Sequence, residues 1–185
     1  MYSIIAFMGP SGSGKSTLQC TLGWKKIVTW TSRSPRNGEI LSLAYNFTDV
    51  ETLKQMEQDG KLLEMTLYNG NYYATDLQSF FEVLEKKSYA SIIVDVNGAK
   101  KLKQMFPLDV LIVGVFAPIE DCKNRLLTRK DAYTDSRLKT YKDEVQNIHE
   151  FSDIIINNGI VQQVTSLQIV SLLKSSIIGM REYDR

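Results

Sequence analysis

The chain has 185 residues, of which 43% are hydrophobic and 23% charged, and its 22 Lys and Arg residues nearly balance its 21 Asp and Glu residues. Such a composition is typical of a folded domain with a sizeable core, and it excludes a disordered chain. The net charge of +1 excludes bulk attraction to a nucleic acid polymer or a membrane, so any anion site must come from local placement of cations.

Three features of the sequence indicate the cellular compartment. Its apolar runs are too short to span a membrane, and its start lacks the basic stretch and cleavage site of a leader. Cys20 and Cys122 are far apart and fit no metal-ligand spacing, which is typical of free thiols in a reducing compartment. We therefore expect a single-domain cytoplasmic protein.

The first motif is GPSGSGKST, from Gly9 to Thr17, directly after the apolar run Tyr2–Met8. It matches G-x-x-x-x-G-K-[ST], in which glycines let successive backbone N–H groups form an anion cradle at a helix N-terminus. Lys15 can reach the β- and γ-phosphates of a nucleotide, and the Ser16 hydroxyl can bind Mg²⁺. A plain Gly/Ser turn would give the lysine and the hydroxyl no role, so the motif predicts a nucleotide-phosphate site.

A strand is expected next at Lys26–Thr31, followed by the loop SRSPRNGE at Ser32–Glu39. Arg33 and Arg36 lie on this loop, on either side of a proline that stiffens it. Two neighbouring guanidinium groups suit bidentate binding of phosphate, although in isolation two solvated surface arginines are the commoner case.

The stretch that follows predicts a small αβ insert over residues 33–75. Thr48 and Glu51 have the spacing of a capping box, Gly60 is a helix stop, and Asn69-Gly70 is a hairpin signal. The expected elements are a strand at Leu43–Phe47, a helix from Thr48 to about Asp59, and strands at Lys61–Leu67 and Tyr72–Ala74.

From residue 76 onward, apolar strands alternate with helices, which predicts a three-layer α/β fold with a parallel sheet. Ligands of such sheets bind at the carboxyl ends of the strands, so we expect the glycine loop, Thr29 and Asp95 to meet in one crevice. The expected elements are a helix at Asp76–Lys87, a strand at Ala90–Val96, a turn at Asn97-Gly98, a helix to about Met105, a strand at Asp109–Phe116, a helix from Pro118 with a break at Asp131–Ser136, a helix at Arg137–Glu150, a strand at Asp153–Ile156 and a helix at Val161–Ile178.

Taken in order, these motifs resemble guanylate kinase, a nucleoside-monophosphate kinase of the P-loop class. The resemblance covers nearly the whole chain, and its part from Arg33 to Thr75 is specific, because other P-loop kinases build the acceptor lobe differently. The matching stretches are GPSGSGKST at 9–17, TSRSPRNGE at 31–39, YNF at 45–47, KLLE at 61–64, GNYYAT at 70–75, VDVNG at 94–98, APIEDCKNRL at 117–126 and IINN at 155–158.

The resemblance implies a three-layer P-loop NTPase fold in three parts. These are a core at 1–32, 76–128 and 138–185, a small GMP-binding lobe at 33–75, and a short lid at about 129–137. It implies transfer of a phosphoryl group from ATP to GMP or dGMP, with Mg²⁺ as cofactor and no nucleic acid or membrane partner. A monomer or a homodimer is expected.

The resemblance also implies a role for individual residues. The catalytic cations are Lys15, Arg129 and Arg137. The ATP-binding residues are Gly9, Ser11, Gly12, Ser13, Gly14, Lys15, Ser16, Thr17, Arg125 and Asn157, with Ser16 also as the metal ligand. The GMP-binding residues are Thr29, Arg33, Arg36, Tyr45, Glu64, Tyr73, Thr75 and Asp95.

The chemistry of guanine agrees with the two acidic residues in that set. Guanine presents hydrogen-bond donors at N1–H and at its exocyclic amine, so the carboxylates of Glu64 and Asp95 can accept from it, whereas adenine N1 would repel them. Without the motif context, a surface strand residue at Glu64 and a helix cap at Asp95 are slightly favoured instead.

The chain departs from the family pattern at three places. Ile93 stands where a second acidic residue is usual, which leaves metal binding to Ser16 and water; Ala74 replaces a glycine; and the lid is short, with TRKD at its start. Two other functions fit parts of the sequence. A phosphopeptide-binding module without catalysis would typically lack a working phosphate loop, and a kinase acting on ribose bisphosphate would not need Glu64 and Asp95.

Overall fold

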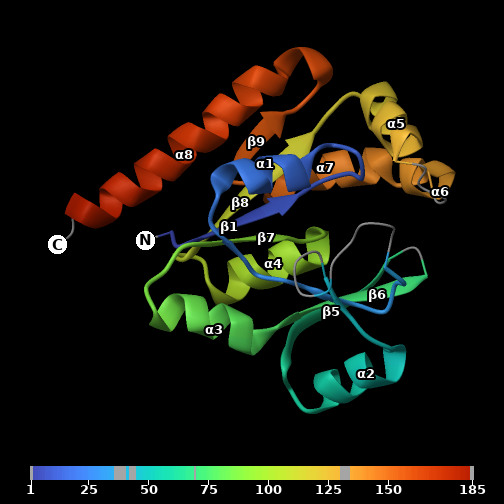
Figure 1. The fold of residues 1–185 in the computed structure, drawn as a ribbon, viewed down its shortest axis with the longest axis vertical. Coiled ribbons are helices and arrows are strands. Elements are labelled where there is room, and N and C mark those ends of the chain that lie inside the picture. The colour runs from blue at the N-terminus through green and yellow to red at the C-terminus, as the bar shows by residue number, and fades with distance from the viewer. Residues whose placement is uncertain (1, 36–40, 42–44, 69, 130–133, 184–185) are drawn as a thin grey trace.

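The computed structural model describes residues 2–35, 41, 45–68, 70–129 and 134–183, and it contains two sheets with their helices (Figure 1). The larger, five-stranded sheet has the order β2-β7-β1-β8-β9, and every pair in it is parallel. Its strands are β1 (Ile4–Met8), β2 (Lys25–Lys26), β7 (Ala90–Ile93), β8 (Val110–Phe116) and β9 (Ile154–Asn157). The parallel core sheet predicted from the sequence is confirmed.

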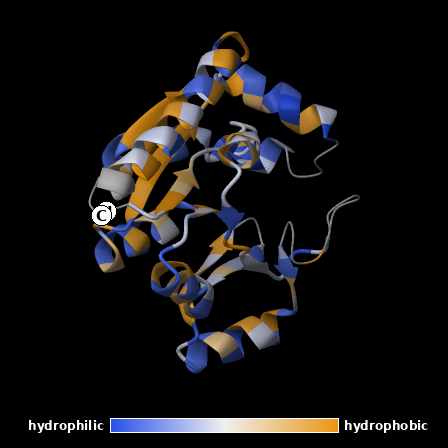
Figure 2. Cartoon of the chain, turned by 60° about the vertical axis from the view of Figure 1, so that its left-hand side comes forward, coloured by the Kyte–Doolittle hydropathy of each residue, from blue (hydrophilic) through white to orange (hydrophobic). Residues whose placement is uncertain are grey.

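Helices cover both faces of this sheet and form the predicted three layers. Along β1, Ile4 and Met8 face one hydrophobic cluster and Ile5 and Phe7 face the other, because successive side chains of a strand point to opposite faces. The first face packs α3 (Leu77–Glu85), α4 (Val96–Met105) and α7 (Tyr141–Phe151), and the second packs α1 (Lys15–Leu22) and α8 (Gln163–Tyr183). Figure 2 shows the central strands of this sheet as largely hydrophobic, as strands buried on both faces require.

The smaller sheet has the order β4-β3-β6-β5 and lies below the core sheet in Figure 1. Its strands are β3 (Trp30–Thr31), β4 (Asn46–Phe47), β5 (Leu62–Tyr68) and β6 (Asn71–Asp76), with helix α2 (Val50–Gln58) packed against it. The expected single strand at Lys26–Thr31 is wrong: its ends belong to different sheets, since Lys26 pairs with β7 and Trp30 pairs with β4 and β6. This segment is therefore where the chain first crosses between the two sheets.

Two local predictions need correction. Asp49, not Thr48, caps α2, since its carboxylate accepts a 2.6 Å hydrogen bond from the Thr52 N–H. Asn97-Gly98 is not a turn between elements but lies in the first turn of α4, because Asp95 caps that helix by accepting from the Gly98 N–H at 2.9 Å. In both places an aspartate in extended conformation sets the helix start.

The C-terminal half carries α5 (Ile119–Thr128), α6 (Thr134–Lys139) and α7. The helix expected over Arg137–Glu150 is divided at Thr140, so Arg137 belongs to the short α6. A short 3-10 helix, η1 (Ile160–Gln162), leads into α8. Among the described residues, no helix combines the length and the apolar character that crossing a membrane would require.

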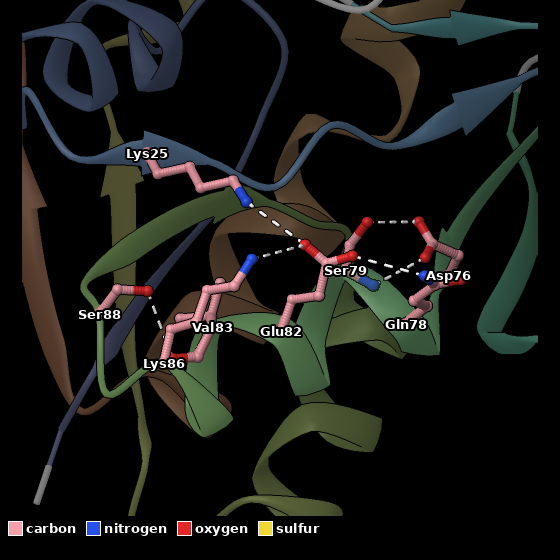
Figure 3. A network of polar contacts seen from close by, with 8 residues as sticks. All are labelled: Lys25, Asp76, Gln78, Ser79, Glu82, Val83, Lys86 and Ser88. Atoms are coloured by element: carbon pink, nitrogen blue, oxygen red, sulfur yellow. Dashed lines mark hydrogen bonds and ion pairs between the residues drawn. The ribbon is translucent and has the colours of Figure 1, made fainter.

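The start of α3 joins the two sheets (Figure 3). Asp76 ends β6 and caps α3, accepting 2.8 Å hydrogen bonds from both the backbone N–H and the hydroxyl of Ser79. It also accepts from the indole N–H of Trp30 at 3.4 Å. One turn further along, Glu82 pairs with Lys25 of β2 at 3.8 Å and with Lys86 at 3.6 Å. Helix α3 thus contacts both the small sheet, through Asp76, and the core sheet, through Glu82.

Candidate functional site

The glycine loop between β1 and α1 is shaped by close contacts that exclude side chains. Gly12 and Gly14 have positive φ angles of 84° and 94°, which L side chains rarely adopt. A Cβ on Gly12 would lie 2.6 Å from the Cys122 carbonyl oxygen, and one on Gly14 would lie 2.2 Å from Nδ2 of Asn158. The loop therefore packs directly on α5 and on the segment after β9.

Two side chains fasten the loop through its carbonyl groups. Arg125 donates from Nη1 to the Gly12 carbonyl at 3.1 Å and from Nη2 to the Asn158 carbonyl at 2.8 Å. Asn158 donates from Nδ2 to the Ser13 carbonyl at 2.8 Å and is buried. Its neighbour Asn157, which was predicted to bind ATP, is exposed and accepts from the Gly159 N–H. Sequence reasoning missed Asn158, although the alternation along β9 puts adjacent asparagines on opposite faces.

The side chain of Lys15 folds back onto the start of the glycine loop. Its ammonium group donates to the carbonyl oxygens of Gly9 at 2.6 Å and Pro10 at 2.8 Å. Burial is the main reason that the pKa of Lys15 falls to about 8; the nearby charge of Glu144 raises it and those of Arg129 and Arg137 lower it further. The next residues, Ser16 and Thr17, are exposed at the start of α1.

The two predicted catalytic arginines reach this loop in different ways. Arg137 on α6 donates from Nη1 to the Ser11 hydroxyl at 2.9 Å, so its guanidinium lies directly on the loop. Arg129 is the exposed residue that follows the last turn of α5, and its charge lowers the pKa of Lys15. The loop thus has a cationic surrounding drawn from three helices.

An arginine among aromatic rings lies in the small sheet. Arg33 is 7% exposed and donates from Nη1 to the Ser34 carbonyl at 2.7 Å. Its guanidinium carbon lies 5.3 Å from the centre of the Tyr45 ring and 5.6 Å from that of Phe47, within range of cation–π attraction. Tyr73 packs edge-on against Tyr45 at 5.9 Å. Phe47 was not among the predicted site residues, and Arg36 lies outside the described residues.

A half-buried carboxylate lies on β5. Glu64 accepts hydrogen bonds from the hydroxyls of Thr75 at 2.9 Å and Thr66 at 3.2 Å. Burial, and secondarily the charge of Asp95, raises the pKa of Glu64 to about 7. The predicted residues Glu64, Thr75 and Asp95 are therefore brought together. Thr66 was missed, though it lies two positions from Glu64 and so on the same face of the strand.

Two further features complete the site. Thr29 is half-buried at the crossing between the sheets, and its carbonyl accepts from the Asn46 N–H at 2.9 Å. A cleft of about 610 Å³ follows β5 between α2 and α4, and Glu57, Glu64, Thr66, Asn97 and Lys101 contribute to its walls. The small-sheet side thus carries carboxylate and hydroxyl acceptors together with Arg33, and the glycine-loop side carries Lys15, Arg125 and Arg137.

Chemically, this arrangement favours binding and charge neutralisation over covalent catalysis. Among the described residues, no group of three or more His, Cys, Asp or Glu side chains is placed to hold a metal ion. The loop can bind phosphate through backbone N–H groups and Lys15, while the opposite side can accept hydrogen bonds from a base.

Comparison with known proteins gives a consistent result. A family model described as guanylate kinase matches residues 2–172. The chain is 28% identical to the guanylate kinase of Bacillus subtilis (strain 168), over 91% of this chain and 87% of that protein. It is 30% identical to the guanylate kinase of Prochlorococcus marinus subsp. pastoris, over 93% of this chain and 97% of that protein. A crystal structure of guanylate kinase from Anaplasma phagocytophilum superposes with a TM-score of 0.75 at 23% identity, covering 95% of this chain and 85% of that one, which confirms the predicted fold.

Proposed function

The chain belongs to the guanylate kinase family, and on this premise we propose that it transfers the γ-phosphoryl group of ATP to GMP or dGMP, giving ADP and GDP or dGDP. The observation that carries the proposal is the pairing of a phosphate-binding loop with a small sheet that carries the half-buried carboxylate of Glu64 on β5 and the buried Arg33 on the loop after β3. The alternative functions considered above need only one half of this pairing.

On the donor side, the backbone N–H groups of residues 9–17 bind the phosphates of ATP, and Lys15 neutralises their charge. Arg125 holds the loop by its hydrogen bond to the Gly12 carbonyl and, as in the family, packs on the adenine. Asn157 contributes from the exposed end of β9. The tight packing of Gly12 and Gly14 supports a cradle that is formed before the nucleotide binds.

On the acceptor side, Arg33 and the hydroxyls of Tyr45 and Tyr73 hold the GMP phosphate, and we assign Arg36 to the same group from the sequence. Glu64 and Asp95 accept from guanine, with Thr29 and Thr75 completing the base pocket. The raised pKa of Glu64 supports this role, because a carboxylate that is desolvated, and whose ionised form is further disfavoured by Asp95, gains from donors on a ligand.

Transfer itself needs positioning and positive charge. The γ-phosphoryl group passes in line from ATP to the GMP phosphate, and Lys15, Arg129 and Arg137 stabilise the charge that develops on its oxygens. The contact of Arg137 with Ser11 supports this assignment, since it brings a guanidinium onto the phosphate loop. No covalent intermediate with the protein is required.

Mg²⁺ is the expected cofactor, and Ser16 is the residue that can bind it. The exposed Ser16 hydroxyl at the start of α1 can supply one oxygen ligand, and nucleotide phosphates and water supply the rest, as is usual for this ion. Ile93 packs with the second hydrophobic cluster and supplies none. Bound there, Mg²⁺ would neutralise phosphate charge.

We further propose a division of the chain into a core (1–32, 76–128 and 138–185), a GMP-binding lobe (33–75) and a short lid (about 129–137). ATP and GMP or dGMP are its only substrates under this proposal. It works in the cytoplasm, as a monomer or a homodimer.

A panel of acceptors tests the function. Release of ADP from ATP is measured with GMP, dGMP, AMP, UMP, IMP and ribose bisphosphate at equal concentrations. GMP and dGMP are expected to give the highest turnover. Preference for an acceptor without guanine would overturn the roles of Glu64 and Asp95, and binding of a phosphopeptide without any turnover would overturn the kinase.

A further inference from the structure

Tyr68 is the last residue of β5, and it joins the small sheet to the phosphate loop. Its hydroxyl lies 3.4 Å from the Ser11 hydroxyl, and it donates to Oε1 of Glu144 on α7 at 3.3 Å. These partners lie 57 positions before it and 76 positions after it in the chain. One side chain therefore connects three elements that the sequence keeps far apart.

The position of Tyr68 on β5 links it to the proposed base pocket. Glu64, Thr66 and Tyr68 alternate along the strand and share one of its faces. Glu64 lies at the base-reading end of that face, and Tyr68 lies at the end that meets the phosphate loop. A shift of β5 caused by a base at Glu64 would thus move Tyr68 relative to the loop.

A row of three tyrosine rings runs between two arginines. Arg33 lies 5.3 Å from the Tyr45 ring, Tyr45 lies 5.9 Å from Tyr73, and Tyr73 lies 6.3 Å from Tyr68. The row ends at Arg137, whose guanidinium carbon lies 5.9 Å from the Tyr68 ring. Tyr68 is thus the ring that connects the proposed acceptor-phosphate group to a proposed catalytic arginine.

Ser11 and Glu144, two polar partners of the Tyr68 hydroxyl, are themselves held in place. Ser11 accepts the 2.9 Å hydrogen bond from Arg137, and Glu144 accepts a 2.6 Å hydrogen bond from the Thr140 hydroxyl at the junction of α6 and α7. Burial is the main reason that the pKa of Tyr68 is raised, which keeps its hydroxyl protonated and able to donate. The hydroxyl therefore meets partners that are themselves fixed.

We propose that Tyr68 is a positioning residue for phosphoryl transfer, which holds the phosphate loop and Arg137 in register with the acceptor lobe. The inference rests on the proposed kinase function. Tyr68 does not touch the reacting atoms; it acts through Ser11 and Arg137. In-line transfer depends steeply on the placement of donor and acceptor, so loosening this connection slows transfer without removing a nucleotide ligand.

The test compares Tyr68→Phe, which keeps the ring and removes the hydroxyl, with Tyr72→Phe as control. Tyr72 is a neighbour on β6 whose hydroxyl makes no contact of this kind in the described structure. We expect Tyr68→Phe to lower kcat roughly 3- to 10-fold, the worth of a hydrogen bond, with KM for ATP and for GMP changed less than about twofold. Tyr68→Leu, which also removes the ring, is expected to lower kcat further. Tyr72→Phe should behave as the wild type, and the Tm of Tyr68→Phe should stay at the wild-type value.

A second measurement separates positioning from simple packing. If Tyr68 acts through Ser11, then Tyr68→Phe should lower kcat less than about twofold in a Ser11→Ala background, because the contact between the two hydroxyls is already broken. Additive losses, or a wild-type kcat in Tyr68→Phe, would overturn the proposal, as would a loss seen only in Tm. The outcome is distinguishable from failure of the kinase function, which would show as absent GMP turnover in the wild-type protein.

Discussion

The two sides of the candidate site are built by different means. The donor side is mainly backbone: nine consecutive residues, Gly9 to Thr17, whose glycines let the loop lie against α5 and the end of β9. The acceptor side is mainly side chains, contributed by the β2–β3 segment, the loop after β3, β4, β5, β6 and the start of α4. A site made from backbone depends on local conformation, whereas a site made from side chains depends on how the whole small sheet is assembled.

The pKa shifts on the two sides have opposite directions but the same cause. Burial lowers the pKa of Lys15 to about 8 on the donor side and raises the pKa of Glu64 to about 7 on the acceptor side. In each case the charged form is disfavoured until a complementary ligand arrives. Phosphate satisfies the ammonium group, and the N–H donors of a base satisfy the carboxylate. Both sides therefore favour binding at the expense of the stability of the free protein.

The largest effect is expected on the donor side, from Lys15→Met. Removing the ammonium group should lower kcat by roughly 10³-fold, because it withdraws a preorganised charge from the transferring phosphoryl group. Tm should not fall, since burial already disfavours the charge of Lys15. Steady-state ADP release and thermal unfolding measure the two quantities. Lys25→Ala, an exposed lysine on β2, serves as control, and wild-type turnover in Lys15→Met would contradict the donor-side mechanism.

A smaller but more selective effect is expected on the acceptor side, from Glu64→Gln. The amide presents a donor toward the donors of guanine, so kcat/KM for GMP should fall roughly 10²-fold while KM for ATP stays nearly constant. The Tm at pH 8 should be at least that of the wild type, because ionised Glu64 is disfavoured by burial.

Glu57→Gln is the matched control for this change. Glu57 is exposed on α2 and lines the same cleft as Glu64. Its replacement should leave kcat/KM for GMP unchanged. Equal losses in the two variants would mean that the general charge of the cleft, rather than Glu64 itself, selects the base.

The pH dependence should separate the two sides in the wild-type protein. Ionised Glu64 can accept from guanine with both oxygens, whereas the protonated carboxyl turns one of them into a donor, so kcat/KM for GMP should fall as pH drops below about 7. Lys15 binds phosphate as a cation, so kcat/KM for ATP should fall as pH rises above about 8. Steady-state profiles with each substrate varied in turn measure this. Glu64→Gln should lose the acidic limb for GMP, and its persistence there would assign that limb to another group.

The contrast between the two sides also explains what the sequence could predict. The donor loop is encoded in one continuous motif, and the alternation of strands and helices was sufficient to predict the parallel core sheet. The acceptor side required the family resemblance, because side-chain partners such as Glu64 and Thr75 meet only through the pairing of β5 and β6. Asn158 and Tyr68 were missed because their partners lie 145 and 57 residues away.

Local errors have equally specific reasons. The apolar pattern at Lys26–Thr31 reports an extended backbone but not its sheet, so it could not reveal that the segment crosses from one sheet to the other. At Thr48 and Asp49, two adjacent residues can both cap a helix, and the carboxylate accepts from Thr52 in the structure. The aspartate at 95 is a cap as well as a proposed reader of guanine, and these two roles use one side chain without conflict.

The smallest expected effect lies at the junction that holds the two sides together. Asp76→Ala removes the cap of α3 and leaves the Trp30 indole N–H without its acceptor, which should lower the free energy of unfolding by about 1–2 kcal/mol. Because Trp30 lies on β3 beside Thr29 and Thr31, the change should raise KM for GMP more than KM for ATP. Asp49→Ala is the matched control: Asp49 also caps a helix of nine residues, but it is exposed, and its helix packs on the small sheet. Urea unfolding and steady-state kinetics compare the two variants. If KM for GMP rises in Asp76→Ala but not in Asp49→Ala, then the cap of α3 helps to position the acceptor side. If KM for GMP changes equally in the two variants, then the acceptor side keeps its geometry without this junction.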